Sequence, residues 1–463
     1  MNRRDVLKTL GALAGAGAAA RVLPACGDGG DDAPTGITNI VVVMMENRSY
    51  DHLFGARSLL EGKPGDGLQA AMANPDLDGR MVPVYPVMSA GMCVPDPPHG
   101  WESSHQQWAS GTNQNFLREF QRTHGGDRSL THVMQYLTRA EVPVSWALAD
   151  AYTTCDRYFC SVMGPTWPNR MFWHSGDSGG LTVNEFPTGG FTWPSIYHRL
   201  DAKGVPWRYY YSDLPVLALI DTLDKEGRVW DISEFFADAQ FGRLPPVTYV
   251  DPGFGTNDDH PPHHPILGQQ FLAAIYTALA TSPQWNNTLL VVTYDEHGGF
   301  FDHVSPPTVQ GDARAAQGFD QLGFRVPTLI AGPYVKPGHV SSVVHDHCSV
   351  LRHIEQMFDL EPCNARTALA SDLTDALDLD ALAAGTPRPP VEIPAVVVDE
   401  SMIGPECRTT IDVRTYPHDM FRFVDEYPAL FAGYDVRERT RELVPMLGDF
   451  LARHGRGGFR RGA

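Results

Sequence analysis

The sequence predicts an α/β protein in which a mainly parallel central sheet is flanked by helices, with long loops over the carboxyl edge of the strands. Continuous apolar runs rich in β-branched residues recur along the chain, and such runs are typical of strands buried on both faces. Patterns with helical periodicity lie between these runs. Strands that alternate with helices indicate a parallel sheet, so we expect functional side chains beyond the carboxyl ends of the strands.

Four segments carry the strand pattern. The clearest are IVVVM at residues 40–44 and TLLVVTY at residues 288–294. Residues 326–330 and the shorter run at 247–250 are further candidates. Their apolar character predicts strands with both faces covered by other elements.

Five segments carry the helical pattern. In the segment at 194–203, Pro194 suits a first helical turn and Gly204 suits the position just past the end. The other segments are residues 130–140, 266–280, 349–358 and 436–451. Together with the strands they predict one large domain, which we place at residues 37–450.

Two further regions have a different character. Residues 61–128 are rich in Gly, Pro and Asp and only weakly periodic, which indicates long loops that partly cover the functional edge of the sheet. Residues 451–463 are basic and glycine-rich, so we expect a disordered tail.

The first 25 residues read as an export signal. Arg3 and Arg4 precede a short apolar run, and the pair resembles the twin-arginine motif. Small residues follow up to Cys26, whose surroundings resemble a lipoprotein processing site, and residues 26–36 would then form a flexible tether. We expect an exported protein that is periplasmic, held at the cell surface through Cys26, or secreted.

Composition excludes some classes of function. The chain has 463 residues, of which 43% are hydrophobic and 20% charged, so it is not disordered throughout. Its formal net charge of −19 argues against non-specific binding to nucleic acid or to anionic lipid surfaces. Of seven cysteines, six remain if Cys26 carries lipid. These six can form three disulfides in 15 pairings, or some can stay as buried thiols.

Acidic and amide side chains follow three of the predicted strands. Glu46 and Asn47 follow the first, Asp251 follows the strand at 247–250, and Asp295 and Glu296 follow the strand at 288–294. Burying a carboxylate is costly unless it is paired or bound to a cation. These groups therefore indicate a metal site at the carboxyl edge, although pairing with arginine or helix capping is the alternative.

Thr166 lies in the segment GPTWPNR at residues 164–170, which leads into an apparent helix. The amino end of a helix attracts a phosphate through its free N–H groups and its dipole. A simple N-cap is the commoner role for such a threonine. The segment becomes informative only together with the other motifs.

Histidine is the natural acid or base near neutral pH and a frequent metal ligand. The chain has 18 histidines, several of them in clusters. His99, His260 and His347 stand out by their place in such clusters, and most of the others are expected to be surface or structural.

Five segments together resemble the bacterial phospholipase C and acid phosphatase family of phosphoesterases, within the alkaline-phosphatase-like superfamily. They are residues 44–55, 164–170, 259–262, 294–304 and 346–351. They follow the order of the family and cover about residues 38 to 360. Five motifs in order are far more specific than one short motif.

The resemblance implies a divalent metal ion held by Glu46, Asn47, Thr166, Asp295 and Glu296. Oxygen ligands favour Ca²⁺ or Mg²⁺, or Mn²⁺, and nearby histidines leave Zn²⁺ open.

The resemblance also implies that Thr166 is the nucleophile and forms a phospho-threonine intermediate. His99 and His260 would contact the phosphate or protonate the leaving group, and His347 is a further candidate. The metal would help to activate the threonine hydroxyl, which is a weak nucleophile by itself.

The substrate class stays open between phosphatidylcholine-type phospholipids, cleaved by a phospholipase C, and small phosphomonoesters, cleaved by an acid phosphatase. Larger family members continue into β-rich domains, whereas about a hundred residues follow position 360 here. The aromatic stretch at 207–211 is either part of a choline pocket or a strand in the core. Two rivals remain: a sulfatase, which would need Cys or Ser at position 166, and a non-catalytic surface lipoprotein that keeps the fold.

Overall fold

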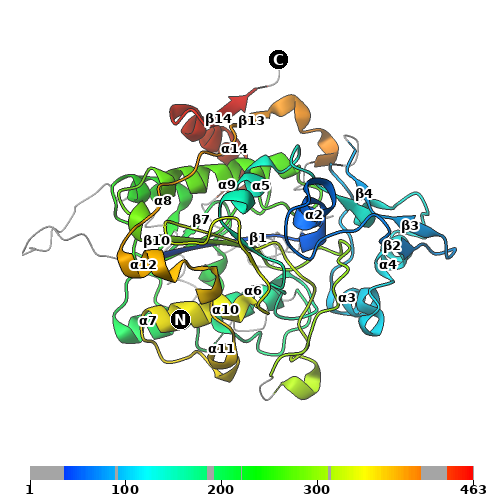
Figure 1. Cartoon of the computed structure of the whole chain (residues 1–463), viewed down its shortest axis with the longest axis horizontal. Coiled ribbons are helices and arrows are strands. Elements are labelled where there is room, and N and C mark those ends of the chain that lie inside the picture. The colour runs from blue at the N-terminus through cyan, green and yellow to red at the C-terminus, as the bar shows by residue number, and fades with distance from the viewer. Residues whose placement is uncertain are drawn as a thin grey trace, which may run out of the picture.

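The computed structural model describes residues 36–88, 92–184, 192–220, 222–310, 314–407 and 435–461. Its centre is an eight-stranded sheet with the order β12-β6-β11-β10-β1-β9-β7-β8, and helices cover both faces (Figure 1). The strands of this sheet are β1 (Asn39–Met45), β6 (Thr153–Cys155), β7 (Trp207–Tyr211), β8 (Val229–Asp231), β9 (Val247–Val250), β10 (Thr288–Tyr294), β11 (Leu329–Ala331) and β12 (Val340–Ser341).

The sheet is mainly parallel, as predicted. β1 pairs in parallel with β10 on one side and β9 on the other, and β9 continues in parallel to β7 and β8. Every residue of β1 and β10 is buried, which explains their unbroken apolar runs. β11 is the exception, because it runs antiparallel to both β10 and β6. The chain returns to it along the carboxyl edge of the sheet without a long crossover helix, which a parallel neighbour requires.

Two groups of helices cover the sheet (Figure 1). One face is covered by α5 (Pro143–Ala151), α8 (Ile232–Gln240), α9 (Pro265–Ala280) and α14 (Val436–Arg453). The other is covered by α6 (Thr166–Ser175), α7 (Ile196–Lys203), α10 (His347–Met357) and α11 (Ala365–Leu369). The smaller elements are α2 (Ala56–Glu61), α3 (Trp101–Trp108), α4 (Phe116–Thr123), α12 (Leu379–Ala384), β2 (Ala73–Pro75), β3 (Met81–Pro83), β4 (Tyr85–Pro86), β5 (Gln135–Tyr136), β13 (Val396–Asp399) and β14 (Gly457–Arg460).

Four of the five predicted helices are present with small differences at their ends. The helix predicted at 194–203 begins at Ile196, because Ser195 caps it through a reciprocal pair with His198, and Gly204 ends it in a left-handed conformation. The helix predicted at 130–140 is wrong. Residues 135–136 instead pair with β4, and the helix begins only at Pro143, which suits a first turn.

The region at 61–128 is more ordered than predicted. It contains α3 and α4 beside the short strands β2 to β4. Phe116, Leu117 and Phe120 are buried on one side of α4. This spacing of one, three and four residues is the helical signal that the surrounding Gly and Pro residues obscured.

The expected disordered tail at 451–463 is also corrected. α14 extends to Arg453, and residues 457–460 form β14, which pairs in parallel with β13. Glycine permits this pairing, because a Cβ on Gly457 would lie 1.8 Å from the carbonyl oxygen of Val396. The predicted signal at 1–25 and most of the tether at 26–36 lie outside the described residues. Among the helices that the structure describes, none is both long and apolar enough to cross a membrane.

Candidate active site

The carboxyl ends of β1 and β10 bring four predicted ligands together. Met45 and Tyr294 are paired in register at the ends of these strands, so Glu46 and Asp295 follow neighbouring positions. The backbone N–H of Asn47 donates to Asp295 Oδ1 over 3.1 Å, which joins the two strand ends. All four polar side chains are buried. β9 ends at the same edge, and Asp251 follows it.

Two glycines allow this close approach. A Cβ on Gly298 would lie 2.1 Å from the carbonyl oxygen of Asn47, and one on Gly299 would lie 2.6 Å from that of Pro98. Both glycines have a φ in the left-handed region, at 64° and 70°, which other residues adopt with strain. The glycine pair after Glu296 therefore lets two loops of the site pack directly against the end of β10.

Several buried oxygen atoms at this edge accept no hydrogen bond, although Arg170 lies 3.5 Å from one of them, Asp295 Oδ2. Asn47 Oδ1 and Glu296 Oε1 are two others. Asn47 itself has a φ of 57°, in the left-handed region that asparagine adopts more readily than most other residues. Buried polar atoms normally take part in hydrogen bonds, so a convergent set of oxygens that accept none fits a divalent cation. Burial and the neighbouring Glu46 charge raise the pKa of Asp295 well above its usual value.

α6 is the third element of the site, and it begins at Thr166. The motif before it is held by Asn169, whose side chain accepts from the Val162 N–H over 3.0 Å and donates to the Gly164 carbonyl over 3.0 Å. Pro165 occupies the N-cap position, and no side chain caps the helix. Thr166 is buried in the first turn. Its position therefore combines the positive end of a helix with a fixed preceding turn.

Arg170 ties this helix to the acidic edge of the sheet. Its guanidinium lies 3.0 Å from Glu46, 3.4 Å from Asp251 and 3.5 Å from Asp295, and it stacks over the ring of Phe254 at 4.7 Å. Burial works against its charge, but the Glu46 and Asp251 carboxylates raise the pKa of Arg170. Because Arg170 lies one helical turn after Thr166, this ion-pair cluster sets the helix start beside the carboxylates.

His99 and His260 lie together, and a third side chain joins them. Their rings are 5.7 Å apart and nearly perpendicular. Asp96 lies 3.6 Å from His99 Nδ1 and 4.0 Å from His260 Nε2. These three groups are arranged closely enough to hold a metal ion. The Asn47 side chain donates to His99 Nε2 over 3.3 Å, and His99 Nδ1 donates to the Pro97 carbonyl over 2.7 Å, so the histidine pair borders the oxygen cluster.

His347, the first residue of α10, also reaches the cluster. Its Nε2 donates to the backbone carbonyl of Asp295 over 2.7 Å, and its Nδ1 has no hydrogen-bond partner. Burial lowers the pKa of His347 to about 4, so the ring is neutral at pH 7. Asp346, which precedes it, accepts from Ser161 over 3.0 Å and pairs with Arg366. All the side chains predicted for the site thus come from segments that meet at one edge of the sheet.

Two other histidines of the motifs have structural partners. His263 donates to Asp258 over 2.6 Å. Asp259 accepts from the Tyr294 hydroxyl over 2.6 Å, and Arg48 donates to the Asp259 carbonyl over 2.7 Å. Farther along the chain, His303 donates to Asp51 in a buried network with Arg325.

Sequence reasoning missed the roles of Asp96 and Arg170. Asp96 stands alone in a proline-rich loop, so only its position three residues before His99 could have suggested it. Arg170 belongs to the motif around Thr166, and its need for buried carboxylate partners is the signal that could have placed it.

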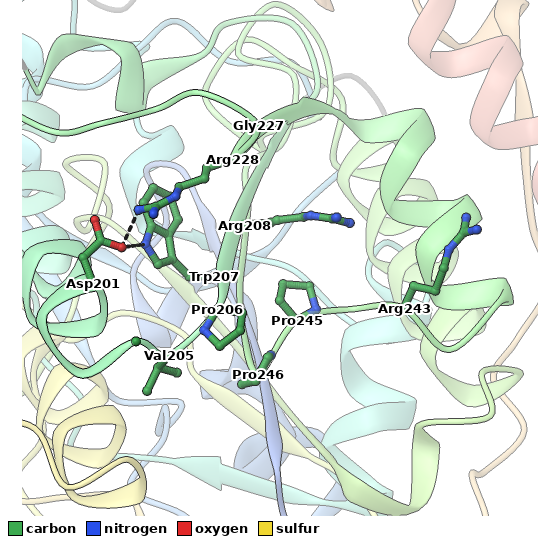
Figure 2. A pocket seen from close by; sticks show the side chains of 11 residues that line it. Asp201, Val205, Pro206, Trp207, Arg208, Gly227, Arg228, Arg243, Pro245 and Pro246 are labelled. Carbon is green, nitrogen blue, oxygen red and sulfur yellow. Dashed lines mark hydrogen bonds and ion pairs between the residues drawn. The ribbon is translucent and has the colours of Figure 1, made fainter. Parts of the chain in front are cut away.

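A cavity of about 610 Å³ lies elsewhere and contains none of the predicted site residues. It opens at the amino ends of β7 and β9, between Trp207 and the prolines that precede β9, with Arg208 and Arg228 on its walls (Figure 2). The active edge is at the opposite end of these strands. The aromatic stretch at 207–211 forms β7, and all four of its aromatic side chains, Trp207, Tyr209, Tyr210 and Tyr211, are buried, so it belongs to the core.

Comparison with known proteins finds a family model and several relatives that match most of the chain. Residues 37–361 match the model described as the Phosphoesterase family. The chain is 33% identical over 358 residues to "Non-specific phospholipase C6" of Arabidopsis thaliana. This match covers 70% of this chain and 68% of that protein.

Two bacterial relatives are similar over comparable lengths. "Phospholipase C A" of Mycobacterium tuberculosis is 31% identical over 452 residues, covering 82% of this chain and 85% of that protein. "Non-hemolytic phospholipase C" of Pseudomonas aeruginosa is 30% identical over 407 residues, covering 74% of this chain and 57% of that protein.

Proposed function

The chain belongs to the phosphoesterase family, and on that premise we propose that it is a phospholipase C-like phosphoric diester hydrolase in which Thr166 is the nucleophile. The observation that carries the proposal is the Arg170 ion-pair cluster, which joins the helix that begins at Thr166 to Glu46 and Asp295 at the acidic edge. A phosphate ester placed there would face the helix start, the acidic edge and two histidines at once.

The groups suited to hold a divalent cation are Glu46, Asn47, Thr166, Asp295 and Glu296. Their oxygen atoms favour Ca²⁺, Mg²⁺ or Mn²⁺, and the neighbouring histidines are ligands that also suit Zn²⁺. When bound, the cation supplies positive charge that stabilises the threonine alkoxide and the phosphate oxygens.

The chain's own residues supply the nucleophile, the proton donor and the positioning of α6. The Thr166 oxygen forms a bond to phosphorus while the bond from phosphorus to the alcohol oxygen breaks. His260 or His99 donates a proton to the departing alcohol oxygen, a role that typically contributes about 10²–10⁴-fold. Water then hydrolyses the phospho-threonine and restores the hydroxyl. Arg170 keeps α6 in register with the carboxylates throughout, since its partners Glu46 and Asp251 lie on the sheet.

The names of the relatives favour a phospholipid substrate over a small phosphomonoester. An acid phosphatase activity on the same groups is the second candidate, because nothing in the acidic edge or in α6 requires a diester. A sulfatase is disfavoured by Thr166, which cannot be converted to formylglycine.

Export to an oxidising compartment fits the one disulfide of the described residues, between Cys93 and Cys407. We therefore keep the twin-arginine route as part of the proposal, with a lipid tether at Cys26 as one of its forms. Cys155, Cys160, Cys348 and Cys363 are buried free thiols whose pKa values are raised by burial.

Hydrolysis of p-nitrophenyl phosphate and p-nitrophenyl phosphorylcholine, measured side by side, tests the proposal. We expect turnover by the wild type that a chelator abolishes and a divalent cation restores. A preference for the phosphorylcholine ester supports phospholipase C, and a preference for the monoester supports an acid phosphatase. Faster turnover of p-nitrophenyl sulfate than of either ester would overturn the assignment.

A further inference from the structure

The loop that carries Asp96 and His99 is joined covalently to the C-terminal part of the chain. Cys93 lies three residues before Asp96 and six before His99, and it forms a disulfide with Cys407 across a sequence separation of 314 residues. Cys407 lies beyond the segment that matches the family, which ends at residue 361. The bond therefore connects the edge of the active site to a region outside the shared core.

The loop is held by the buried side chains of Val94 and Pro97 and by its two ends. Pro95, Pro97 and Pro98 have no N–H to donate, so the backbone between Cys93 and His99 has few hydrogen bonds to offer. The fixed φ of each proline also makes the segment stiff, which means that anchoring the two ends sets the place of Asp96 between them.

The downstream end is held by packing and hydrogen bonds. The Gln107 side chain donates to the Pro98 carbonyl over 2.7 Å, and the Ser104 hydroxyl donates to the His99 carbonyl over 3.1 Å. Gly299 lies close to the same carbonyl, because a Cβ on it would be 2.6 Å from the Pro98 oxygen. The upstream end is held by the disulfide at Cys93.

The partner cysteine, Cys407, is buried, and the segment that leads to it begins at β13. β13 pairs with β14, and β14 packs against α14. α14 in turn packs against α9, one of the helices that cover the sheet. The segment that carries Cys407 thus continues from a strand that is attached to the body of the fold.

We propose that the Cys93–Cys407 disulfide is a positioning device that holds Asp96 and His99 against the acidic edge of the sheet, so that the oxidised enzyme binds the phosphate group and the reduced enzyme binds it weakly. This inference rests on the proposed function, in which His99 contacts the phosphate. Breaking the bond frees the upstream end of the loop, and a displacement of about 1 Å at such a group can cost up to about 10²-fold.

The test uses the full chain, as the wild type with and without a phosphine reductant and as the double variant Cys93→Ser/Cys407→Ser. The binding of inorganic phosphate is measured by calorimetry, and kcat and KM are measured with p-nitrophenyl phosphate. Thiol titration verifies the reduction, and circular dichroism verifies the fold at the assay temperature. Cys363→Ser, at a buried free thiol, is the matched control.

We expect reduction to weaken phosphate binding and to raise KM by about 10-fold, with a smaller change in kcat and faster hydrogen exchange at residues 94–99. The double variant should show the same values with and without reductant, and Cys363→Ser should respond to reductant as the wild type does. A lower melting temperature with unchanged phosphate affinity and KM would show that the bond serves stability alone, and would overturn the proposal.

The two proposals fail in different ways. If the oxidised wild type binds phosphate but turns over neither ester, the proposed function fails and the phosphate titration still decides the role of the disulfide. If turnover is present and indifferent to verified reduction, the positioning role fails and the proposed function stands. Should the double variant not fold, the reduced wild type, checked by circular dichroism, gives the decision.

Discussion

The carbonyl oxygen of Asn47 lies 2.1 Å from the point where a Cβ on Gly298 would be. This contact joins the two strand ends that supply the oxygen cluster, and it makes position 298 intolerant of any side chain. We expect Gly298→Ala to lower the free energy of unfolding by about 3 kcal/mol or more, since it combines a left-handed φ with a backbone clash. Chemical denaturation measures the change.

Gly204→Ala is the matched control for that variant. Gly204 has a similar φ of 74°, but nothing lies within 4 Å of its Cβ position. Only the conformational cost remains there, about 1 kcal/mol. Equal losses for the two variants would contradict the view that Gly298 is required by the approach of Asn47.

Removal of a divalent cation should destabilise the wild type. Buried carboxylates without a counter-ion are costly, so we expect a chelator to lower the melting temperature and added Ca²⁺, Mg²⁺ or Mn²⁺ to restore it. Glu296→Gln should weaken cation binding by at least about 10-fold, because it removes a charged ligand. Elemental analysis and thermal unfolding check both, with Glu226→Gln at an exposed site as the control. Purified protein with neither bound metal nor a thermal response would rule out this site.

The proposed acid should matter most for poor leaving groups. p-Nitrophenolate departs readily without a proton, whereas the phenolate from phenyl phosphate needs more assistance. We expect His260→Ala to lower kcat/KM by about 10²–10⁴-fold on phenyl phosphate and by less on p-nitrophenyl phosphate. Measurement of kcat/KM on both esters, for the wild type and for His260→Ala, checks this prediction. Equal losses on both would place His260 in binding rather than in proton transfer.

Stability should depend on pH through His303. Burial disfavours the charged ring, but its hydrogen bond to Asp51 raises the pKa of His303 to about 9. Asp51, Asp66 and Arg325 face the ring, and the ordinary pKa of histidine is about 6.5. The charged pair therefore stabilises the fold fully below about pH 6.5, and this contribution is lost as the pH rises through 9.

His303→Gln tests that dependence. Urea unfolding between pH 6 and pH 10 should show a wild-type advantage of about 2 kcal/mol at pH 6 that shrinks towards pH 10. A difference between the two proteins that stays constant over this range would contradict the titration of His303.

The elements that sequence patterns located best are those whose burial is uniform. The run at 288–294 coincides with β10 because neighbours cover both of its faces, so nothing interrupts the apolar pattern. The segment at 130–140 misled, because its pairing with β4 depends on residues far away in the chain. The tail misled for the same reason, since Gly457 forms a strand only where Val396 is near.

The site residues also divide into those that sequence patterns could place and those that they could not. Glu46, Asn47, Asp295 and Glu296 could be placed from sequence, because strand ends of a parallel sheet meet at one edge. Asp96 could not, because its neighbours His99 and His260 come together only in the folded chain.

The disulfide was equally out of reach of the sequence. Spacing gave no preference among fifteen pairings, and the bond from Cys93 joins residues 314 positions apart.

The most direct test of the account is whether Thr166 becomes phosphorylated during turnover. Wild type, Thr166→Ala and the control Thr277→Ala, at a buried threonine of α9, are mixed with p-nitrophenyl phosphate, quenched in acid within one turnover and digested for mass spectrometry. We predict phosphate on Thr166 in the wild type and in Thr277→Ala, and neither phosphopeptide nor turnover in Thr166→Ala. Turnover by Thr166→Ala at the wild-type rate, or a phosphate on another residue, would contradict the account.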